Sequence, residues 1–232
     1  MGNLYIVSTP IGNLEDISLR ALRILQEADL ILCEDTRTAR KLLDYYQISN
    51  NLSSYYQHSK IRKIDWILKL LEQGKNLALI SEAGTPCISD PGSQLINAII
   101  SHLPEAKIIP IPGPSALIAA ASISGLPVDK FLFLGFLPLK NKRDKFLQQI
   151  IVHLKNSKYP VIFYESPYRI IKTLTEINKK AGKNGLKLYL SVGRELTKQF
   201  ETVYRGEIEE VIEQIKKGPL KGEFTAVLSK KN

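Results

Sequence analysis

The sequence predicts an α/β protein of two domains, with a mostly parallel N-terminal sheet and a mixed C-terminal sheet. Short apolar runs alternate with helix-length amphipathic segments through the first half, which is the pattern of β-α-β units. Near the C-terminus, three strand-like runs have only one helix among them, which favours a mixed sheet. The 232 residues suit one large domain or two small ones, and 44% hydrophobic with 24% charged residues excludes a disordered chain.

The first half holds four predicted strands and four predicted helices. Apolar runs predict buried strands at residues 4–7, 30–33, 77–80 and from 108 onward. Amphipathic patterns predict helices from residue 19, at 36–46, at 61–73 before Gly74, and from 90 to about 102.

Two of these helices have predicted N-terminal caps. Ser18 precedes a helix whose apolar positions share one face, namely Leu19, Leu22, Ile24 and Leu25. Asp90 and Pro91 are typical of a cap followed by a first-turn proline.

The second half continues the alternation at first and then becomes richer in strands. Strands are predicted at residues 131–136, 161–164, 188–192, 202–204 and 224–228. Helices are predicted at residues 142–154, where the segment is basic, and at 207–217. We expect the boundary between residues 112 and 113, which gives domains 1–112 and 113–232.

The charge is distributed unevenly between the two halves. The net charge is +9, but residues 1–127 carry 11 basic and 12 acidic side chains, whereas residues 128–232 carry 21 and 11. A basic half beside a neutral half indicates a polyanionic partner that the second half binds. The alternative is a lysine-rich surface that serves only solubility.

Composition also bears on the compartment. Cys33 and Cys87 are too few for a disulfide scaffold, and their apolar surroundings predict reduced thiols in a cytoplasmic protein. The first ten residues lack the charged start of a signal peptide. Residues 108–128 carry no charge, but four prolines and two glycines interrupt them, so we expect no membrane span.

Three loops that follow predicted strands are rich in glycine and proline, at residues 8–13, 81–92 and 110–116. In open α/β sheets, ligands bind beyond the carboxyl ends of the strands. Small residues let a ligand approach the backbone, and prolines hold a loop open. The alternative is tight turns in a compact sheet, but three such loops on one sheet edge favour a ligand site.

The sequence lacks the common cofactor signatures. It contains no G-x-G-x-x-G and no P-loop, which leaves dinucleotide binding and nucleotide hydrolysis unsupported. The three histidines, His58, His102 and His153, are scattered without a metal-ligand spacing, so we expect no metal. The residues alone predict a two-domain α/β protein with a ligand site and a polyanionic partner.

Eight segments, in order along the whole chain, carry a resemblance to a known family: residues 4–17, 34–37, 83–92, 112–116, 131–138, 163–167, 194–198 and 221–224. The chain resembles the tetrapyrrole-methylase superfamily of S-adenosylmethionine (SAM) enzymes, and within it the branch that acts on ribosomal RNA. The resemblance implies 2′-O-methylation of a cytidine in the decoding region of 16S rRNA in the small ribosomal subunit. It also implies a cytoplasmic homodimer that releases S-adenosylhomocysteine.

The resemblance further implies a SAM site in the cleft between the two domains. The implied cofactor contacts are Pro10, Ala83, Gly84, Thr85, Ile88, Ser115, Ala116, Tyr164, Glu165, Phe224 and Thr225. The chain departs from the family pattern at Thr38, Tyr56 and Tyr168, where histidine is usual, and at Glu82, where aspartate is usual.

A ribose hydroxyl gains from a nearby base, and the candidates are Glu34, Asp35, Glu165 and Glu195. For each, the alternative is an ion pair with a neighbouring arginine. Phosphate contacts are assigned to Arg37, Arg169 and Arg194, whose planar forks suit two oxygens, and to Lys140, Lys142, Arg143 and Lys145 in the basic segment. Tyr168 either stacks on a base or packs at a helix start.

Three functions compete at this point. The first is the rRNA ribose methyltransferase. The second is a methyltransferase for a corrin precursor, which has no need of a strongly basic half. The third is a non-catalytic RNA-binding protein, which leaves the three loops unexplained.

Overall fold

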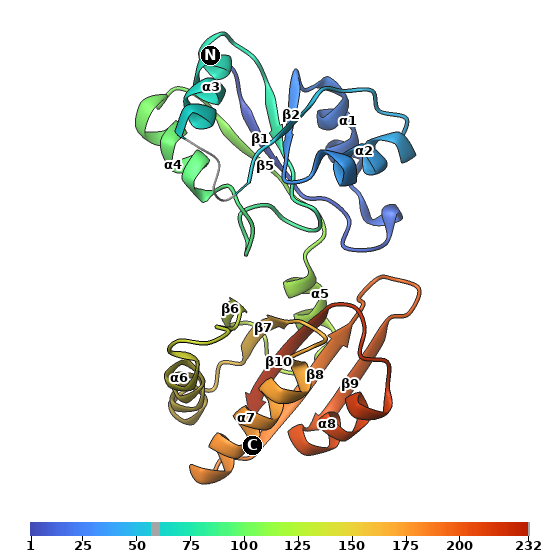
Figure 1. Cartoon of the computed structure of the whole chain (residues 1–232), viewed down its shortest axis with the longest axis vertical. Helices are drawn as coiled ribbons and strands as arrows, with labels where there is room; N and C mark the ends of the chain where they lie inside the picture. Colours follow the sequence, from blue (N-terminus) through green and yellow to red (C-terminus); the bar gives the residue numbers. More distant parts are fainter. Residues whose placement is uncertain (57–60, 232) are drawn as a thin grey trace. The chain divides into compact units, whose positions relative to one another are not determined.

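The computed structural model describes residues 1–56 and 61–231, so His58 lies outside the described residues. The chain divides into two compact units, Met1–Ser115 and Ala116–Asn232 (Figure 1). This division falls three residues beyond the predicted boundary at 112/113. The two units are described separately below.

The first unit is built on a five-stranded parallel sheet with the order β3-β2-β4-β1-β5. Its strands are β1 (Leu4–Val7), β2 (Leu30–Cys33), β3 (Leu52–Ser54), β4 (Leu77–Leu79) and β5 (Ile108–Ile111). Sequence analysis missed β3, because it is a three-residue edge strand with two serines and so lacks an apolar run.

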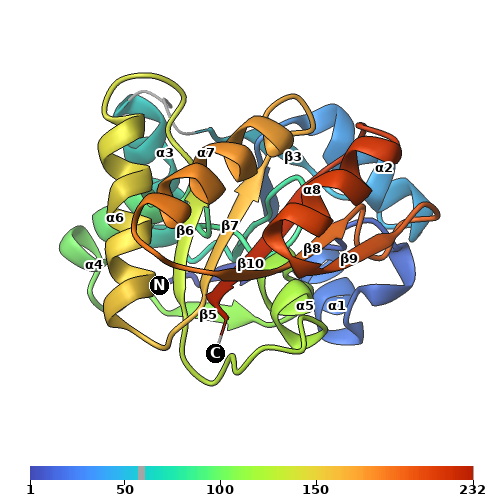
Figure 2. The ribbon, with the colours of Figure 1, turned by 90° about the horizontal axis from the view of Figure 1, so that it is seen from below.

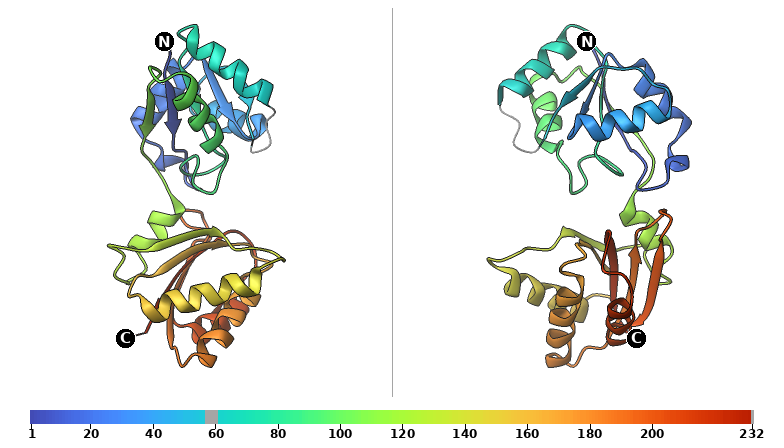
Figure 3. Two further views of the ribbon diagram at one scale, coloured as in Figure 1. Left: turned by 90° about the vertical axis from the view of Figure 1, so that its left-hand side faces the viewer. Right: turned by 45° about the vertical axis from the view of Figure 1, so that its right-hand side comes forward.

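Helices cover both faces of this sheet (Figure 3). On one face lie α1 (Leu19–Glu27) and α2 (Thr36–Tyr45), and on the other α3 (Ile61–Glu72) and α4 (Ser93–His102). A short 3-10 helix, η1 (Leu14–Asp16), precedes α1. Burial of both faces accounts for strands that are almost continuously apolar.

The two predicted caps have different outcomes. Ser18 caps α1 as predicted, and its side chain accepts a hydrogen bond from the Ala21 N–H at 3.1 Å. Leu19, however, is 85% exposed, so the buried face of α1 is formed by Ala21, Ile24 and Leu25. The predicted cap at Asp90 is wrong, because α4 begins at Ser93 with Gly92 at the N-cap. The chain turns sharply at Gly92, where φ is +142° and a Cβ would lie 2.3 Å from Cys87 Sγ.

The second unit contains a five-stranded mixed sheet with the order β6-β7-β10-β8-β9. Its strands are β6 (Leu132–Phe136), β7 (Val161–Glu165), β8 (Leu188–Arg194), β9 (Thr202–Glu207) and β10 (Phe224–Lys230). Only β6 and β7 pair in parallel, and the other three pairs are antiparallel. Together the two sheets confirm the predicted fold class.

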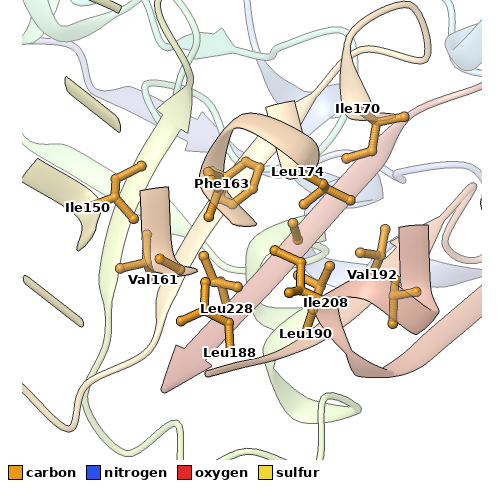
Figure 4. Packing of buried hydrophobic residues seen from close by; sticks show 14 of the residues in the cluster. Ile150, Val161, Phe163, Ile170, Leu174, Leu188, Leu190, Val192, Ile208 and Leu228 are labelled. Carbon is orange, nitrogen blue, oxygen red and sulfur yellow. The ribbon is translucent and has the colours of Figure 1, made fainter. Parts of the chain in front are cut away.

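The helices of this unit are α5 (Ala116–Ser122), α6 (Arg143–Asn156), α7 (Ile170–Lys183) and α8 (Ile208–Lys217). Figure 2 shows α6, α7 and α8 together over one face of the sheet. Their apolar sides and that face form the main core, which includes Phe163, Leu174 and Leu190 (Figure 4). No helix bounds were predicted between residues 165 and 187, so α7 is an addition to the predicted elements.

Two further features concern the whole chain. Within the described ranges, no helix combines the length and the apolarity that a membrane crossing requires. Both cysteines are free thiols, Cys33 buried and Cys87 partly buried.

Candidate functional site

The three glycine- and proline-rich loops of the first unit lie side by side, because β4, β1 and β5 are neighbours in a parallel sheet. Thr9 and Gly84 exchange two backbone hydrogen bonds of 2.9 and 3.0 Å, which join the first loop to the second. The Ser8 hydroxyl donates to Thr85 Oγ1 at 3.0 Å, and Thr85 Oγ1 donates to the carbonyl of Pro114 at 3.2 Å. One hydrogen-bonded chain therefore links all three loops.

Two glycines make this close packing possible. Gly84 has φ of +82°, and a Cβ there would lie 3.3 Å from Ile11 Cγ2. A Cβ on Gly113 would lie 3.0 Å from the Cβ of Ser8. The small residues therefore allow the loops to pack on one another. A ligand would contact the part of the loop surface that this packing leaves exposed.

That surface is formed by some of the predicted cofactor contacts and not by others. Ala83 and Ile88 are exposed, and Thr85 and Ser115 are partly exposed. Ala116, also partly exposed, is the first residue of the second unit. Pro10 and Gly84 are buried, so they fix the shape of the loop edge. The predicted residues of the first unit therefore lie along one edge of the sheet.

Acidic side chains lie on the same edge. Burial, together with the charges of Glu34 and Glu82, raises the pKa of Asp90 to about 6, against the opposing effect of a hydrogen bond with Ser81. The Ser81 hydroxyl also lies 3.2 Å from the carbonyl of Gly84, so Asp90, Ser81 and Gly84 lie close together within the second loop. Sequence analysis missed Asp90 as a site residue because the adjacent proline indicated a helix cap.

Asp35 and Arg37, at the start of α2, form a local pair. Asp35 is the N-cap and accepts from the Arg37 N–H at 2.8 Å, while the guanidinium binds the same carboxylate at 2.6 Å. The side-chain hydrogen bond from Arg37 lowers the pKa of Asp35 to about 2. Asp35 is therefore a weak base, and Glu34 beside it is exposed.

In the second unit the predicted contacts come together in pairs on neighbouring strands. Tyr164 of β7 pairs with Thr225 of β10, and Glu165 pairs with Phe224. Because successive residues of a strand point to opposite faces, the two pairs face opposite sides of the sheet. Phe224 lies in the core beneath α6, α7 and α8, so the Phe224 and Glu165 side chains point away from the face of Tyr164 and Thr225.

Glu165 is the centre of a buried polar network. Its side chain is fully buried, forms an ion pair with Arg169 at 2.5 Å, and accepts from Thr173 Oγ1 at 2.7 Å. Arg143 reaches the same Thr173 hydroxyl at 2.8 Å and pairs with Glu176 at 2.9 Å. The geometry gives Glu165, Arg169 and Arg143 internal partners, which favours structural roles over the predicted base and phosphate contacts.

Arg194 and Glu195 form a second network where β8 ends. Arg194 is buried and donates to the carbonyls of Lys221 and Phe200 at 2.8 and 3.0 Å. Glu195 pairs with Lys198 at 2.9 Å and accepts from the Glu223 N–H at 2.9 Å. Burial would raise the pKa of Glu195, but these hydrogen bonds and the nearby cations lower it overall. Both side chains hold the start of β10 in place, and neither faces solvent freely.

The remaining predicted RNA contacts are exposed. Lys140, Lys142 and Lys145 are exposed at the beginning of α6, where Lys142 is the N-cap in the left-handed region. Arg37 is also exposed, although Asp35 binds it. Tyr168 is 94% exposed, so it does not pack at the start of α7. Of the other departures from the family pattern, Thr38, Tyr56 and Glu82 are exposed.

In the part of the chain that the structure describes, no three histidine, cysteine or acidic side chains are grouped so that they could hold a metal ion. The small residues, the backbone groups and the carboxylates of the first unit suit an organic cation with polar ends.

The family model of the tetrapyrrole (corrin/porphyrin) methylases matches residues 3–212. The chain therefore belongs to the tetrapyrrole methylase family. A relative from Thermotoga maritima is 43% identical over 231 residues, and the alignment covers 100% of both chains. A relative from Hydrogenobaculum sp. is 45% identical, with 99% of this chain and 96% of the relative covered. Both relatives carry the name ribosomal RNA small subunit methyltransferase I.

Solved structures agree on the fold. The methyltransferase CobJ matches with a TM-score of 0.69 at 18% identity, over 99% of this chain and 95% of its own. The uroporphyrin-III C-methyltransferase from Thermus thermophilus, solved with S-adenosylhomocysteine, matches with a TM-score of 0.64 at 17% identity, over 98% and 97%. At these identities the match concerns the fold alone.

Proposed function

We propose that this protein transfers the methyl group of SAM to the 2′-oxygen of a cytidine in the decoding region of 16S rRNA. The observation that carries the proposal is the identity of 43–45% over essentially the whole chain to relatives named ribosomal RNA small subunit methyltransferase I. We propose further that the protein acts as a cytoplasmic homodimer.

The first unit fits SAM by its chemistry. SAM supplies a methyl group on a sulfonium, which is already activated for transfer. Glu34, Glu82 and Asp90 concentrate negative charge on the sheet edge, as the raised pKa of Asp90 indicates, and a cation there reduces their mutual repulsion. Ala83, Thr85 and Ile88 present small or apolar surface on the same edge. Tyr164 and Thr225 are the proposed contacts from the second unit.

The protein's main contribution is alignment of the acceptor with the donor, a proximity effect of up to roughly 7–11 kcal/mol. The hydrogen-bonded chain through Ser8, Thr85 and Pro114 holds the loops in one arrangement, which is the rigidity that alignment requires. Exposed lysines of the second unit are the proposed phosphate contacts.

We assign the role of base to Asp90. The pKa of Asp35 is lowered to about 2 and that of Glu195 is lowered as well, so both are poor proton acceptors. The carboxylate of Glu165 is buried and already engaged by Arg169 and Thr173. With its pKa raised to about 6, Asp90 is ionised at neutral pH and more basic than an ordinary aspartate. Glu34 is the remaining candidate for the base from the sequence. It is exposed, and its negative charge contributes to the raised pKa of Asp90.

The experiment that tests the proposal offers several acceptors to the purified protein with labelled SAM: assembled small subunits, naked 16S rRNA and a corrin precursor. We expect label in RNA, and nuclease digestion with mass spectrometry should place the added methyl on the ribose of a cytidine. A methyl on the base refutes the 2′-oxygen assignment, and label only in the corrin precursor refutes RNA as the substrate.

A further inference from the structure

Three aromatic side chains stand out on one edge of the second sheet. Phe136 ends β6, Tyr168 lies in the turn after β7, and Phe200 lies between β8 and β9; they are 59%, 94% and 66% exposed. β6 runs parallel to β7, and both β7 and β8 run antiparallel to β10, so β6, β7 and β8 end at the same edge (Figure 1). We call Phe136, Tyr168 and Phe200 the aromatic edge.

The structure holds these residues in place. The Phe136 ring lies against that of Tyr164, with centroids 5.4 Å apart. The carbonyl of Phe200 accepts from buried Arg194 at 3.0 Å. Next to Tyr168, the Arg169 side chain turns inward to Glu165 and to the carbonyl of Leu137, at 2.5 and 3.1 Å, which anchors the turn that carries the tyrosine. The backbone at these positions is therefore held before a ligand binds, and only the exposed rings of Tyr168 and Phe200 have side-chain freedom to lose.

The charge around the aromatic edge is positive. Lys140, Lys142, Lys172 and Lys221 lie next to the ends of β6 and β7 or the start of β10, all exposed and without a side-chain ion pair among the described residues. The acidic groups nearby are largely neutralised, since Arg169 pairs with Glu165 and Lys198 pairs with both Glu195 and Glu223. The second half of the chain, residues 128–232, has a net charge of +10.

Exposed aromatic rings interspersed with lysines are the chemistry that binds single-stranded nucleic acid, because bases stack on rings while cations follow the backbone. Single exposed apolar residues need no explanation, but these three come from three separate segments that meet at one edge. From β6 to β8 there are three strand spacings, about 14 Å in all, a span of a few nucleotides.

We propose that the aromatic edge binds an unpaired segment of the RNA substrate, with Tyr168 and Phe200 stacking on its bases. The inference rests on the proposed function and makes it narrower, because it requires that the RNA substrate contains an unpaired segment that the second unit binds.

The test measures binding of an oligoribonucleotide of about ten unpaired nucleotides, and of the same strand in a duplex, by fluorescence anisotropy with the full chain. Replacing Tyr168 or Phe200 by alanine should weaken binding of the unpaired strand roughly 5- to 150-fold for each stacked base. The salt dependence should stay the same, because no cation is removed. Tyr168→Phe keeps the ring and should bind like the wild type. Tyr159→Ala removes a 42% exposed tyrosine from the opposite edge of the sheet and is the matched control.

Equal affinity of wild type, Tyr168→Ala and Phe200→Ala for the unpaired strand overturns the inference, and so does equal wild-type affinity for the strand and the duplex. Light scattering of the same variants tests whether a second copy of the chain covers the aromatic edge instead of RNA. Loss of a dimer with unchanged RNA affinity would assign the edge to that second copy and overturn the inference. Methyl transfer by the wild type to small subunits is measured in parallel. Absence of methyl transfer refutes the proposed function. If methyl transfer is present but the variants bind RNA like the wild type, only the role of the aromatic edge in RNA binding is refuted.

Discussion

At the scale of single residues, Gly84 is a constrained position at the contact between the first two loops of the candidate site. Its φ of +82° and its contact with the Ile11 side chain both oppose a larger residue. We predict that Gly84→Val abolishes SAM binding measured by calorimetry while the unit stays folded. The left-handed conformation alone costs a β-branched residue about 1–2 kcal/mol.

The control for this substitution is Gly74→Val. Gly74 has nearly the same φ, +83°, but a Cβ there meets no atom within 4 Å, so it repeats the backbone strain away from the loops. Unaltered SAM affinity in Gly84→Val would contradict the placement of SAM against this loop.

Asp90 gives a prediction about pH and activity. As the base, its carboxylate form is the active one, so methyl transfer should rise as pH increases through about 6. Asp90→Asn should lower the rate at saturating SAM roughly 10²–10⁴-fold and remove this step from the pH profile. Glu105→Gln, at an exposed carboxylate that precedes β5 and so lies away from the three loops, serves as the control. An Asp90→Asn enzyme with a normal rate and profile would exclude Asp90 as the base.

The same residue makes stability depend on pH in a defined direction. Folding raises the pKa of Asp90 from 3.8 to about 6, so between these values the folded state binds more protons than the unfolded state. Asp90 therefore favours the folded state most at low pH, and this contribution is lost as pH rises through the window. We predict that Asp90→Asn gains stability relative to wild type from pH 4 to pH 7, by about 1 kcal/mol after solvent screening is allowed for. Urea unfolding at several pH values measures the difference.

At the scale of elements, the network around Glu165 ties β7 to α7 and α6. Glu165→Ala would leave the Arg169 guanidinium and the Thr173 hydroxyl without their acceptor. We predict a loss of about 3–5 kcal/mol in the free energy of unfolding, measured with urea. Glu213→Ala breaks an exposed pair with Lys216 and should cost less than about 1 kcal/mol.

The stability measurement also separates a structural role from a catalytic one. Glu165→Gln keeps the shape and an acceptor for Thr173, so methyl transfer per folded molecule should be retained. A large loss of rate with unchanged stability would instead restore Glu165 as a catalytic candidate.

At the scale of the whole molecule, the charge is concentrated in the second unit. Lys140, Lys142 and Lys145 are exposed around the start of α6, whereas Arg143 between them is engaged with Thr173 and Glu176. We predict that glutamate at the three lysines weakens binding to small subunits. The slope of log affinity against log salt should become shallower by about 2–3, because each phosphate contact contributes roughly 0.7–0.9.

A matched triple variant separates a local contact from total charge. Lys155, Lys158 and Lys183 are exposed on the same unit, and changing them to glutamate alters the net charge by the same amount. An equal effect of both triple variants would show that only the overall field of the unit acts on the RNA.

The sequence by itself determined the features that depend on local pattern. Apolar periodicity specified most strands and helices, although it gave no bounds for α5 and α7. It succeeded where burial of a strand or of one helix face imposes a fixed spacing on apolar residues. The alternation of strands and helices also predicted that the three loops lie together, since the carboxyl ends of neighbouring parallel strands meet at one edge of the sheet. The pattern was insufficient for β3, which is too short and polar, and it misplaced the start of α4, which depends on the packing of Gly92 against Cys87.

Only the tertiary structure decided what each charged side chain does. Glu165, Arg143 and Arg194 have the residue types of a catalytic or RNA-binding site, but their partners fix them inside the second unit. Asp90 is a residue type that commonly caps helices, but burial and two neighbouring carboxylates raise its pKa and make it the most basic aspartate of the site edge. The physical reason is that burial and pairing come from residues distant in sequence, such as Arg143 and Thr173, which only the folded chain brings together.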